Sequence, residues 1–448
     1  ILLERDDFGA GVSWASHRIV HGGLRYLQSL DIERFRESVR ERRWFMETFP
    51  EHIEPLACLV PLDNSGTRRR SLFAAAELVN NTLNAVFGGS TPRLPGAQTL
   101  PASALAAAAP AVDAAGVSAV GRWHDGLMVS SERVLIGMLR RACDLGAVAL
   151  NFTSVQSAKA EGGQGEISLG CVDADSREVV VRARRVVNTA GPSCGSVAAM
   201  FGGTHQTLFE PMRAFNVLLD VEPGLSSAVA LESKAADGRM LFVIPGPAGL
   251  AIGTWEEPAD GHVSPTESSV RTLLELAGSL LAREDLALDR VSAVWSGLLP
   301  RKPGPELTPA DRPRIVDHGK VGGMAGAFSV SGVKYTTARH VAEAVLGCAF
   351  PGHRAKVPVL PITDPLLCAG SLAEPPEAGA VSEVVRGMIR DEAARTVDDV
   401  CRRRTAWYSR PDRLRGVAST VGEPFGLCAD ESAEAVERAI ESAREMRG

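Results

Sequence analysis

The sequence of 448 residues predicts an α/β fold assembled from separated segments of the chain, with an α+β domain between them and a small helical domain at the end. Three observations support this prediction. Residues 119–155 read as strand, helix and strand, and residues 214–294 read as antiparallel strands with a single helix. Residues 314–347 then read as strand, glycine turn and helix, which returns to the first pattern.

Composition predicts an ordinary globular protein. Hydrophobic residues make up 45% and charged residues 23%, while aromatic residues reach only 5% and the net charge is -6. Low aromatic content and the absence of a basic block argue against nucleic acid as a partner. The eight cysteines show neither a CxxC pair nor metal-ligand spacing, so we expect reduced thiols, a cytoplasmic protein and no metal site.

The chain opens on ILLE, which reads as a buried strand that ends in an acidic residue. In a dinucleotide-binding unit, a carboxylate at this place hydrogen-bonds the ribose hydroxyls, which makes Glu4 a candidate for that role. A chain that opens inside such a strand predicts further residues upstream of Ile1.

The segment SHRIVHGGLRYLQ, residues 16–28, places histidines, glycines and arginines ahead of a predicted helix over 24–49 that Pro50 ends. A second helix is expected over 71–87, followed by an alanine-rich run near 100–116 that reads as a surface excursion. A strand, an amphipathic helix capped by Ser131 and a strand AVALNFTSV then form a βαβ-like crossover.

Further strand patterns, EISLGCVDAD and REVVVRARRVVN, lead to the small-residue turn TAGP, a place where backbone can approach a ligand. The strands FNVLLDV, GRMLFVIPG, GLAIGTW and DRVSAVWSGLLP, with one helix, form the predicted α+β domain. Amphipathic helices at 380–404 and 430–446 form the C-terminal domain.

Several segments together resemble the FAD-dependent glycerol-3-phosphate dehydrogenases, within the glutathione-reductase-like flavoproteins that include the D-amino-acid oxidases. The resemblance rests on LLERDDFGAGVSWASHRIVHGGLRYLQ, WHDGLMVSSERVLIGMLRRACDLGAVALNFTSV, VNTAGP, GRMLFVIPG with GLAIGTW, SGVKYTTAR and VVRGMIRDEAARTVDDVCRRRT. It implies a discontinuous Rossmann-type FAD-binding domain. The G-x-G-x-x-G that such a domain carries ahead of the ribose-binding acid is absent from this sequence.

The resemblance implies site residues. His21 and Lys334 are candidate catalytic groups, and the substrate-binding candidates are Arg25, Tyr26, Asn216 and Arg301. Residues expected to contact FAD are Glu4, Ser13, Ser16, Gly22, Gly23, Val155, Ala190, Gly191, Gly332, Val333, Lys334 and Thr336. Glycines 22 and 23 are expected to let backbone come within contact of the flavin ring, and Lys334 to stabilise negative charge on its reduced form.

Two departures from the family bear on the substrate. Asn216 stands where the glycerol-3-phosphate enzymes carry a histidine, and Leu299 stands where they carry an arginine before a proline. Arg213 or Arg301 is a candidate to replace the missing arginine.

The resulting prediction is FAD-dependent oxidation of a secondary alcohol, first of all glycerol 3-phosphate or a related polyol phosphate, with quinone or oxygen as electron acceptor. The alternatives are an amine or amino-acid oxidase and a non-catalytic flavoprotein. Homodimer formation and contact with the inner face of a membrane stay open. The expected FAD-binding segments are 1–60, 121–210 and 306–350, the substrate-domain segments 61–120 and 211–305, and the helical domain 351–448.

Overall fold

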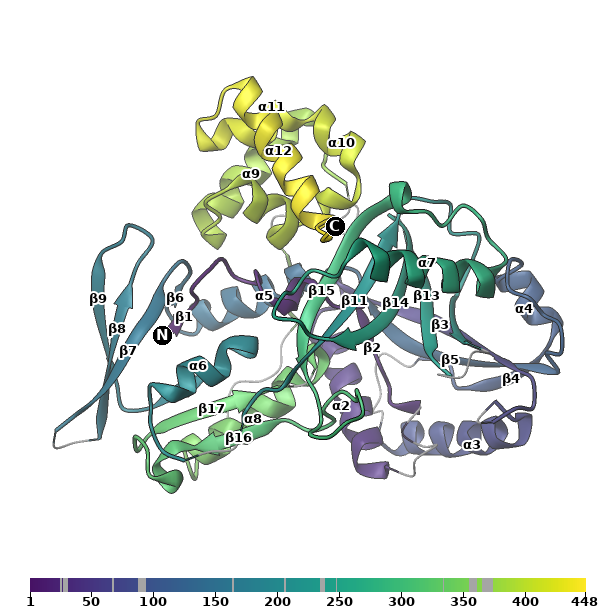
Figure 1. The fold of residues 1–448 in the computed structure, drawn as a ribbon, viewed down its shortest axis with the longest axis horizontal. Helices are drawn as coiled ribbons and strands as arrows, with labels where there is room; N and C mark the ends of the chain where they lie inside the picture. Colours follow the sequence, from purple (N-terminus) through teal and green to yellow (C-terminus); the bar gives the residue numbers. More distant parts are fainter. Residues whose placement is uncertain are drawn as a thin grey trace.

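A computed structural model describes most of the chain (Figure 1). The described residues are 1–24, 26, 31–66, 68–87, 94–162, 165–204, 207–233, 238–246, 248–332, 334–353, 361–364 and 374–448.

A curled nine-stranded sheet is the largest element of the fold. Its strand order is β15-β11-β14-β13-β12-β3-β5-β2, with β4 also paired to β5, and only β12 and β3 run parallel to each other. The bounds are β2 Ile19–Val20, β3 Ile53–Leu62, β4 Gln98–Pro101, β5 Ala119–Met128, β11 Pro211–Leu219, β12 Ala228–Glu232, β13 Met240–Gly246, β14 Gly249–Pro258 and β15 Val291–Pro300.

Helix α7 (Glu267–Leu281) covers this sheet because its apolar residues recur on one face. Thr266 caps its first turn by accepting a hydrogen bond from the backbone N–H of Ser269. The short helix α4 (Ser103–Ala108) packs into the same core, where Leu105 and Ala109 are fully buried. The expectation of a surface excursion was wrong in part, because Leu105, Ala109 and Val112 pack into the core while Ala106, Ala107 and Ala114 are exposed.

Three smaller sheets hold the other strands (Figure 1). β1 pairs with β6 in parallel, β10-β17-β16 form a mixed sheet in which β10 and β17 are parallel, and β7-β8-β9 form an antiparallel sheet. The bounds are β1 Leu2–Leu3, β6 Ala149–Leu150, β7 Ser154–Glu161, β8 Glu166–Val172, β9 Glu178–Ala183, β10 Val186–Asn188, β16 Arg314–Asp317 and β17 Ala327–Ser331.

The predicted crossover differs from the observed one. Helix α5 (Ser131–Asp144) joins β5 of the large sheet to β6 of a different sheet, so it links two sheets instead of two strands of one. Its cap is Ser130, whose hydroxyl accepts from the backbone N–H of Arg133, one residue before the cap we expected. Phe152 adopts a positive φ of 50° and separates β6 from β7 within the single strand that the sequence suggested.

Helix α2 (Ile32–Thr48) begins later than the periodicity predicted, since Asp31 caps it and accepts from the backbone N–H of Arg34. The remaining helices before the C-terminal region are α3 (Arg70–Phe87), α6 (Cys194–Ala199) and α8 (Ala338–Ala349).

The C-terminal helices form a separate layer above the rest of the molecule (Figure 1). They are α9 (Ala378–Glu392), α10 (Pro411–Gly416), α11 (Ala418–Gly422) and α12 (Ala429–Ala443). The helix predicted over 380–404 ends at Glu392, because Ala393 adopts a left-handed conformation; residues Asp399–Arg404 then form a π-helical turn.

In the described residues, no helix combines the length and the apolar character that crossing a bilayer requires. The same residues hold no cluster of three or more metal-ligating side chains, and their cysteines are free thiols. The division of the chain into domain segments stays a prediction.

Candidate functional site

His21 follows β2 directly, and β2 pairs with β5 so that Val20 lies opposite Gly126. This register places His21 beside Asp125, the preceding residue of β5. Nδ1 of His21 lies 3.1 Å from Oδ2 of Asp125. Within the described part of the chain, Nε2 of His21 has no hydrogen-bond partner, and the side chain is 39% exposed. The ring is therefore held at one nitrogen and open at the other.

Asp125 is a buried carboxylate that accepts hydrogen bonds from four groups. Besides His21, its oxygens accept from the backbone N–H of Gly22 at 2.7 Å, from Trp123 Nε1 at 3.1 Å and from Arg42 Nη1 at 3.2 Å. Burial by itself raises the pKa of Asp125, but the hydrogen bond and charge of His21, with Arg42 and Gly22, lower that pKa to about 2. Asp125 is consequently ionised at neutral pH.

The double glycine has a different structural reason from the one we expected. A Cβ at Gly22 would lie 1.9 Å from Nη1 of Arg42, and a Cβ at Gly23 would lie 2.9 Å from Cβ of Ser38. Gly23 also has a φ of +84°, which favours glycine. The side-chain faces of both glycines are therefore filled by helix α2. A flavin contact from their other faces stays a prediction.

Tyr26 joins the glycine turn to Lys334. Its backbone N–H donates to the carbonyl of Gly23, and its hydroxyl oxygen accepts from Nζ of Lys334 at 2.5 Å. Lys334 also lies 5.2 Å from the centre of the Tyr26 ring, and the guanidinium of Arg34 lies 4.5 Å from it. Among the residues that the structure places, no carboxylate lies within ion-pairing distance of Lys334.

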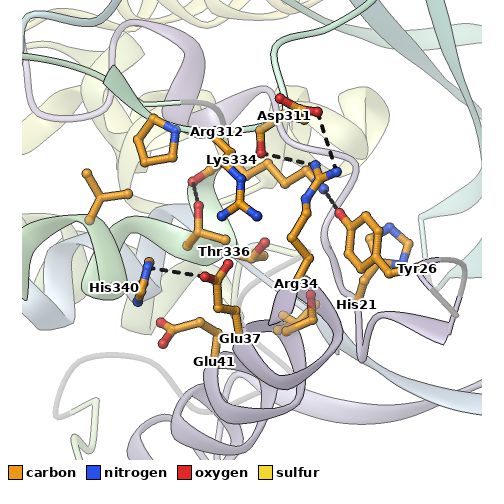
Figure 2. A pocket seen from close by; sticks show the side chains of 15 residues that line it. His21, Tyr26, Arg34, Glu37, Glu41, Asp311, Arg312, Lys334, Thr336 and His340 are labelled. Carbon is orange, nitrogen blue, oxygen red and sulfur yellow. Dashed lines mark hydrogen bonds and ion pairs between the residues drawn. The ribbon is translucent and has the colours of Figure 1, made fainter. Parts of the chain in front are cut away.

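These groups line one cavity of about 210 Å³ (Figure 2). His21, Tyr26 and Arg34 lie at one part of its wall, with Lys334 above them, and helix α2 forms the floor in the view shown. Figure 2 also shows Arg34 directed to Asp311, whose carbonyl oxygen accepts from its Nη2 at 3.0 Å. The complete lining is Val20, His21, Tyr26, Arg34, Glu37, Ser38, Glu41, Asp311, Arg312, Pro313, Lys334, Thr336, Thr337, His340 and Val341.

The large sheet connects a neutral polar group, Asn216, to His17 through Thr254. Oδ1 of Asn216 accepts from the hydroxyl of Thr254 at 2.9 Å, and that hydroxyl lies 3.4 Å from Nδ1 of His17. The His17 and His21 rings pack edge-on against Phe242, at 6.5 and 5.7 Å between ring centres. Burial, with a smaller effect from the charge of His21, lowers the pKa of His17 to about 3, so this imidazole is neutral.

The structure does not bring the candidate replacement arginines to the cavity. Arg213 is 2% exposed and pairs with Glu257 and Asp260. Arg301 donates to the carbonyl of Gly304 at 2.8 Å and lies 3.5 Å from Glu210. Arg25 and Val333 lie outside the described residues.

The other predicted FAD contacts lie in two groups. Glu4 ends the β1 region, where its carbonyl accepts from the backbone N–H of Thr153, and Val155 packs in one apolar cluster with Leu3. Burial raises the pKa of the Glu4 carboxyl. Ala190, Gly191 and Gly332 follow the carboxyl ends of β10 and β17, while Ser13 and Ser16 lie in and after the 3₁₀ turn Val12–Trp14.

The residues present fit an FAD-binding site. Gly191, with a φ of +53°, and Gly332 both have open space within 4 Å of where a Cβ would stand. Because β10 and β17 are parallel neighbours, the two glycines lie at the same edge of their sheet, where such folds admit a nucleotide cofactor. The residues that would hold the group are Glu4, Gly191, Gly332 and the cation Lys334.

Sequence reasoning missed Asp125, Arg34 and Arg42. Asp125 stands in the quoted segment WHDG, but only the pairing of β2 with β5 places it at His21. Arg42 stands seven residues after Phe35 and three after Val39, on the buried face of helix α2, so helical spacing was a signal that it turns inward. The contact of Arg34 with Tyr26 is visible only in the structure.

Comparisons with known proteins agree on the family. Residues 1–346 match the family described as DAO, FAD dependent oxidoreductase. The chain is 26% identical over 384 residues to a glycerol-3-phosphate dehydrogenase of Synechocystis sp., covering 82% of this chain and 68% of that protein. It is 27% identical over 382 residues to the mitochondrial glycerol-3-phosphate dehydrogenase of Homo sapiens, covering 79% of this chain and 50% of that protein. The chain thus spans about half the length of its mitochondrial relatives.

Solved structures show the same fold. The glycerol-3-phosphate dehydrogenase of Bacillus halodurans, complexed with FAD, matches with a TM-score of 0.70 at 18% identity, covering 99% of this chain and 90% of that chain. The L-proline dehydrogenase of P. horikoshii matches with a TM-score of 0.57 at 17% identity, covering 80% and 87%. These matches confirm the predicted fold class, and with the match over residues 1–346 they show that the chain belongs to the DAO family of FAD-dependent oxidoreductases.

Proposed function

We propose that this protein oxidises the secondary alcohol of a phosphorylated polyol to a ketone, with glycerol 3-phosphate as the first candidate and dihydroxyacetone phosphate as its product. The observation that carries the proposal is one cavity lined by both a histidine and a lysine, of which, among the described residues, Nε2 of the histidine has no hydrogen-bond partner and the lysine no carboxylate partner. A base and a cation in one cavity suit a substrate that carries a hydroxyl and an anionic group.

His21 is the proposed proton acceptor. Its free Nε2 takes the hydroxyl proton, and FAD, when bound, accepts the hydride that leaves the same carbon. His17 is buried and neutral, and the amide of Asn216 has no basic nitrogen, which leaves His21 as the suitable base among these three residues.

Lys334 and Arg34 supply the positive charge for the phosphate group. Lys334 donates only to the Tyr26 hydroxyl in the described contacts, so two of its three donors are available. Arg34 is shared with two carboxylates, Asp31 and Asp311, each at 3.8 Å, which reduces its pull on an anion. Lys334 therefore carries most of the proposed charge recognition, and Arg25 stays a predicted second partner.

The electron acceptor is proposed to be quinone or oxygen. Contact with a membrane surface is supported by helix α3, which exposes Leu72, Leu78 and Val79 by 40%, 70% and 40% directly after Arg69 and Arg70. Sedimentation with vesicles of anionic phospholipid tests this contact, and a Leu78→Ser variant that binds equally well would remove α3 from it.

The activity is tested by loading the protein with FAD and following flavin absorbance without oxygen. Glycerol 3-phosphate is expected to bleach the flavin, and glycerol at the same concentration to bleach it far less. Bleaching by amino acids alone would instead assign an amine or amino-acid oxidase. A flavin that no alcohol or amine reduces would contradict catalysis altogether.

A further inference from the structure

Asp125 makes contacts that the pairing of its strand does not require. Its main chain belongs to β5, opposite Leu56 of β3, while its side chain is buried and accepts from four donors that come from three separate parts of the chain. Three of these partners, the Gly22 N–H, the Trp123 indole N–H and the Arg42 guanidinium, can only donate, so they favour the ionised carboxylate, which can only accept. Its partner atom on His21 must therefore carry the proton.

This requirement fixes the tautomer of His21. With the proton on Nδ1, the lone pair of a neutral imidazole is on Nε2, the atom without a partner at the cavity. In the opposite tautomer, an unprotonated Nδ1 would face an ionised carboxylate at 3.1 Å, which is a repulsive contact.

Arg42 and Gly22 hold Asp125 itself in place. Arg42 donates from Nη1 both to the carbonyl of His124 at 2.7 Å and to Asp125, and it occupies the space where any side chain at position 22 would stand. The other titratable groups near the pair are His17 and His124, whose pKa values burial lowers, and Cys58 on β3, whose thiol pKa burial raises. None of the three adds a competing charge at neutral pH.

We propose that Asp125 is the positioning residue for His21. It holds the imidazole as the Nδ1–H tautomer, aims Nε2 at the substrate hydroxyl and stabilises the imidazolium that forms when the proton arrives. When that proton moves, the hydroxyl O–H bond breaks, an N–H bond forms at Nε2 and the electron pair stays on the substrate oxygen. The inference rests on the proposed function, because it assigns the proton to His21.

The first test reads the tautomer without any turnover. In ¹⁵N-histidine-labelled protein loaded with FAD, His21 is assigned by the signal lost in a His21→Gln variant, since the chain has nine histidines. Spectra are recorded as the pH is raised until a single proton remains on the ring, and in that neutral form we expect the proton on Nδ1 and none on Nε2. A neutral His21 with its proton on Nε2 overturns the proposal, whether or not any variant folds.

The second test compares Asp125→Asn with Trp123→Phe. Asp125→Asn keeps the shape but removes the charge, and it should lower kcat on the order of 10²- to 10⁴-fold with KM within about threefold. Trp123→Phe removes another donor to the same carboxylate without touching His21, and it should leave kcat within about threefold. An unchanged kcat in Asp125→Asn, or an equal fall in both variants, overturns the positioning role.

The two proposals fail in different ways. A wild-type flavin that no alcohol reduces overturns the proposed oxidation of an alcohol. Reduction by glycerol 3-phosphate together with the Nε2–H tautomer overturns only the role of Asp125.

Discussion

The buried ion pair between Asp7 and Arg404 gives the sharpest stability prediction. Arg404 is 0% exposed, and its two terminal nitrogens lie 2.7 and 2.9 Å from the two oxygens of Asp7. The next carboxylate, Glu392, lies 3.8 Å away and already binds Arg133 at 2.8 Å, so it does not replace Asp7. Asp7→Asn leaves a buried cation uncompensated and should lower the free energy of unfolding by about 3–5 kcal/mol.

Urea unfolding followed by tryptophan fluorescence measures this loss, with Asp7→Leu combined with Arg404→Met as the matched control. Removing both charges leaves no unpaired ion, so the double variant should be more stable than either single variant. A single Asp7→Asn variant within 1 kcal/mol of the wild type would refute the reasoning, as would a double variant less stable than both.

The same pair predicts how stability depends on pH. Burial alone raises the pKa of Asp7, but the hydrogen bond and charge of Arg404 outweigh it and lower that pKa below its usual value. A depressed folded-state pKa contributes stability that is fully present above the unfolded value near pH 4 and is lost as the pH falls through the folded value. The wild type should therefore lose more stability than Asp7→Asn on acidification from neutral pH, and parallel losses would contradict this.

Three further predictions concern the cavity, the core and a buried hydroxyl. Lys334→Met should raise KM for glycerol 3-phosphate about 10- to 100-fold in a steady-state assay, because the anionic substrate loses a charged hydrogen-bond donor. The control variant Lys320→Met, at a lysine that is 79% exposed, should leave KM unchanged. Leu105→Ala should lower the free energy of urea unfolding by about 2–5 kcal/mol, and a loss under 1 kcal/mol would contradict the burial of Leu105 in the core. Tyr408→Phe removes the oxygen that accepts from Arg18 at 3.1 Å and from a buried indole, and it should reduce stability by about 1–3 kcal/mol in thermal unfolding.

Local patterns predicted most of the elements because their causes are local. Apolar strand patterns located β5, β11, β13, β14 and β15 of the large sheet but not β2, β3, β4 and β12, and the spacing of Val270, Leu273, Leu274 and Ala277 located α7. The end of helix α9 was not predictable from such signals. Residue 393 adopts the left-handed conformation that ends the helix, but it is an alanine, and no glycine or proline marks this position.

The pairing of distant segments could not be predicted in the same way. The sequence identified His21, but its partner Asp125 is 104 residues away and is brought near only by the register of β2 against β5. The double glycine was recognised as a close approach of two groups, and the group that approaches the side-chain face of Gly22 is Arg42 of the next helix. A glycine shows that space is scarce and does not show what occupies it.

The C-terminal layer holds both ends of the segment that leads to His21. Asp7 is bound by Arg404, and Arg18 is bound by the hydroxyl of Tyr408, nearly four hundred residues later in each case. Residues earlier in the chain hold the same two ends, since Asn151 donates to Asp7 at 2.8 Å and Arg18 donates to the carbonyl of Val129 at 2.9 Å. During synthesis on a ribosome, the segment should therefore be positioned first by residues 128–153 and receive its last contacts only at release, and a premature stop after α8 should leave Asp7 and Arg18 without their C-terminal partners.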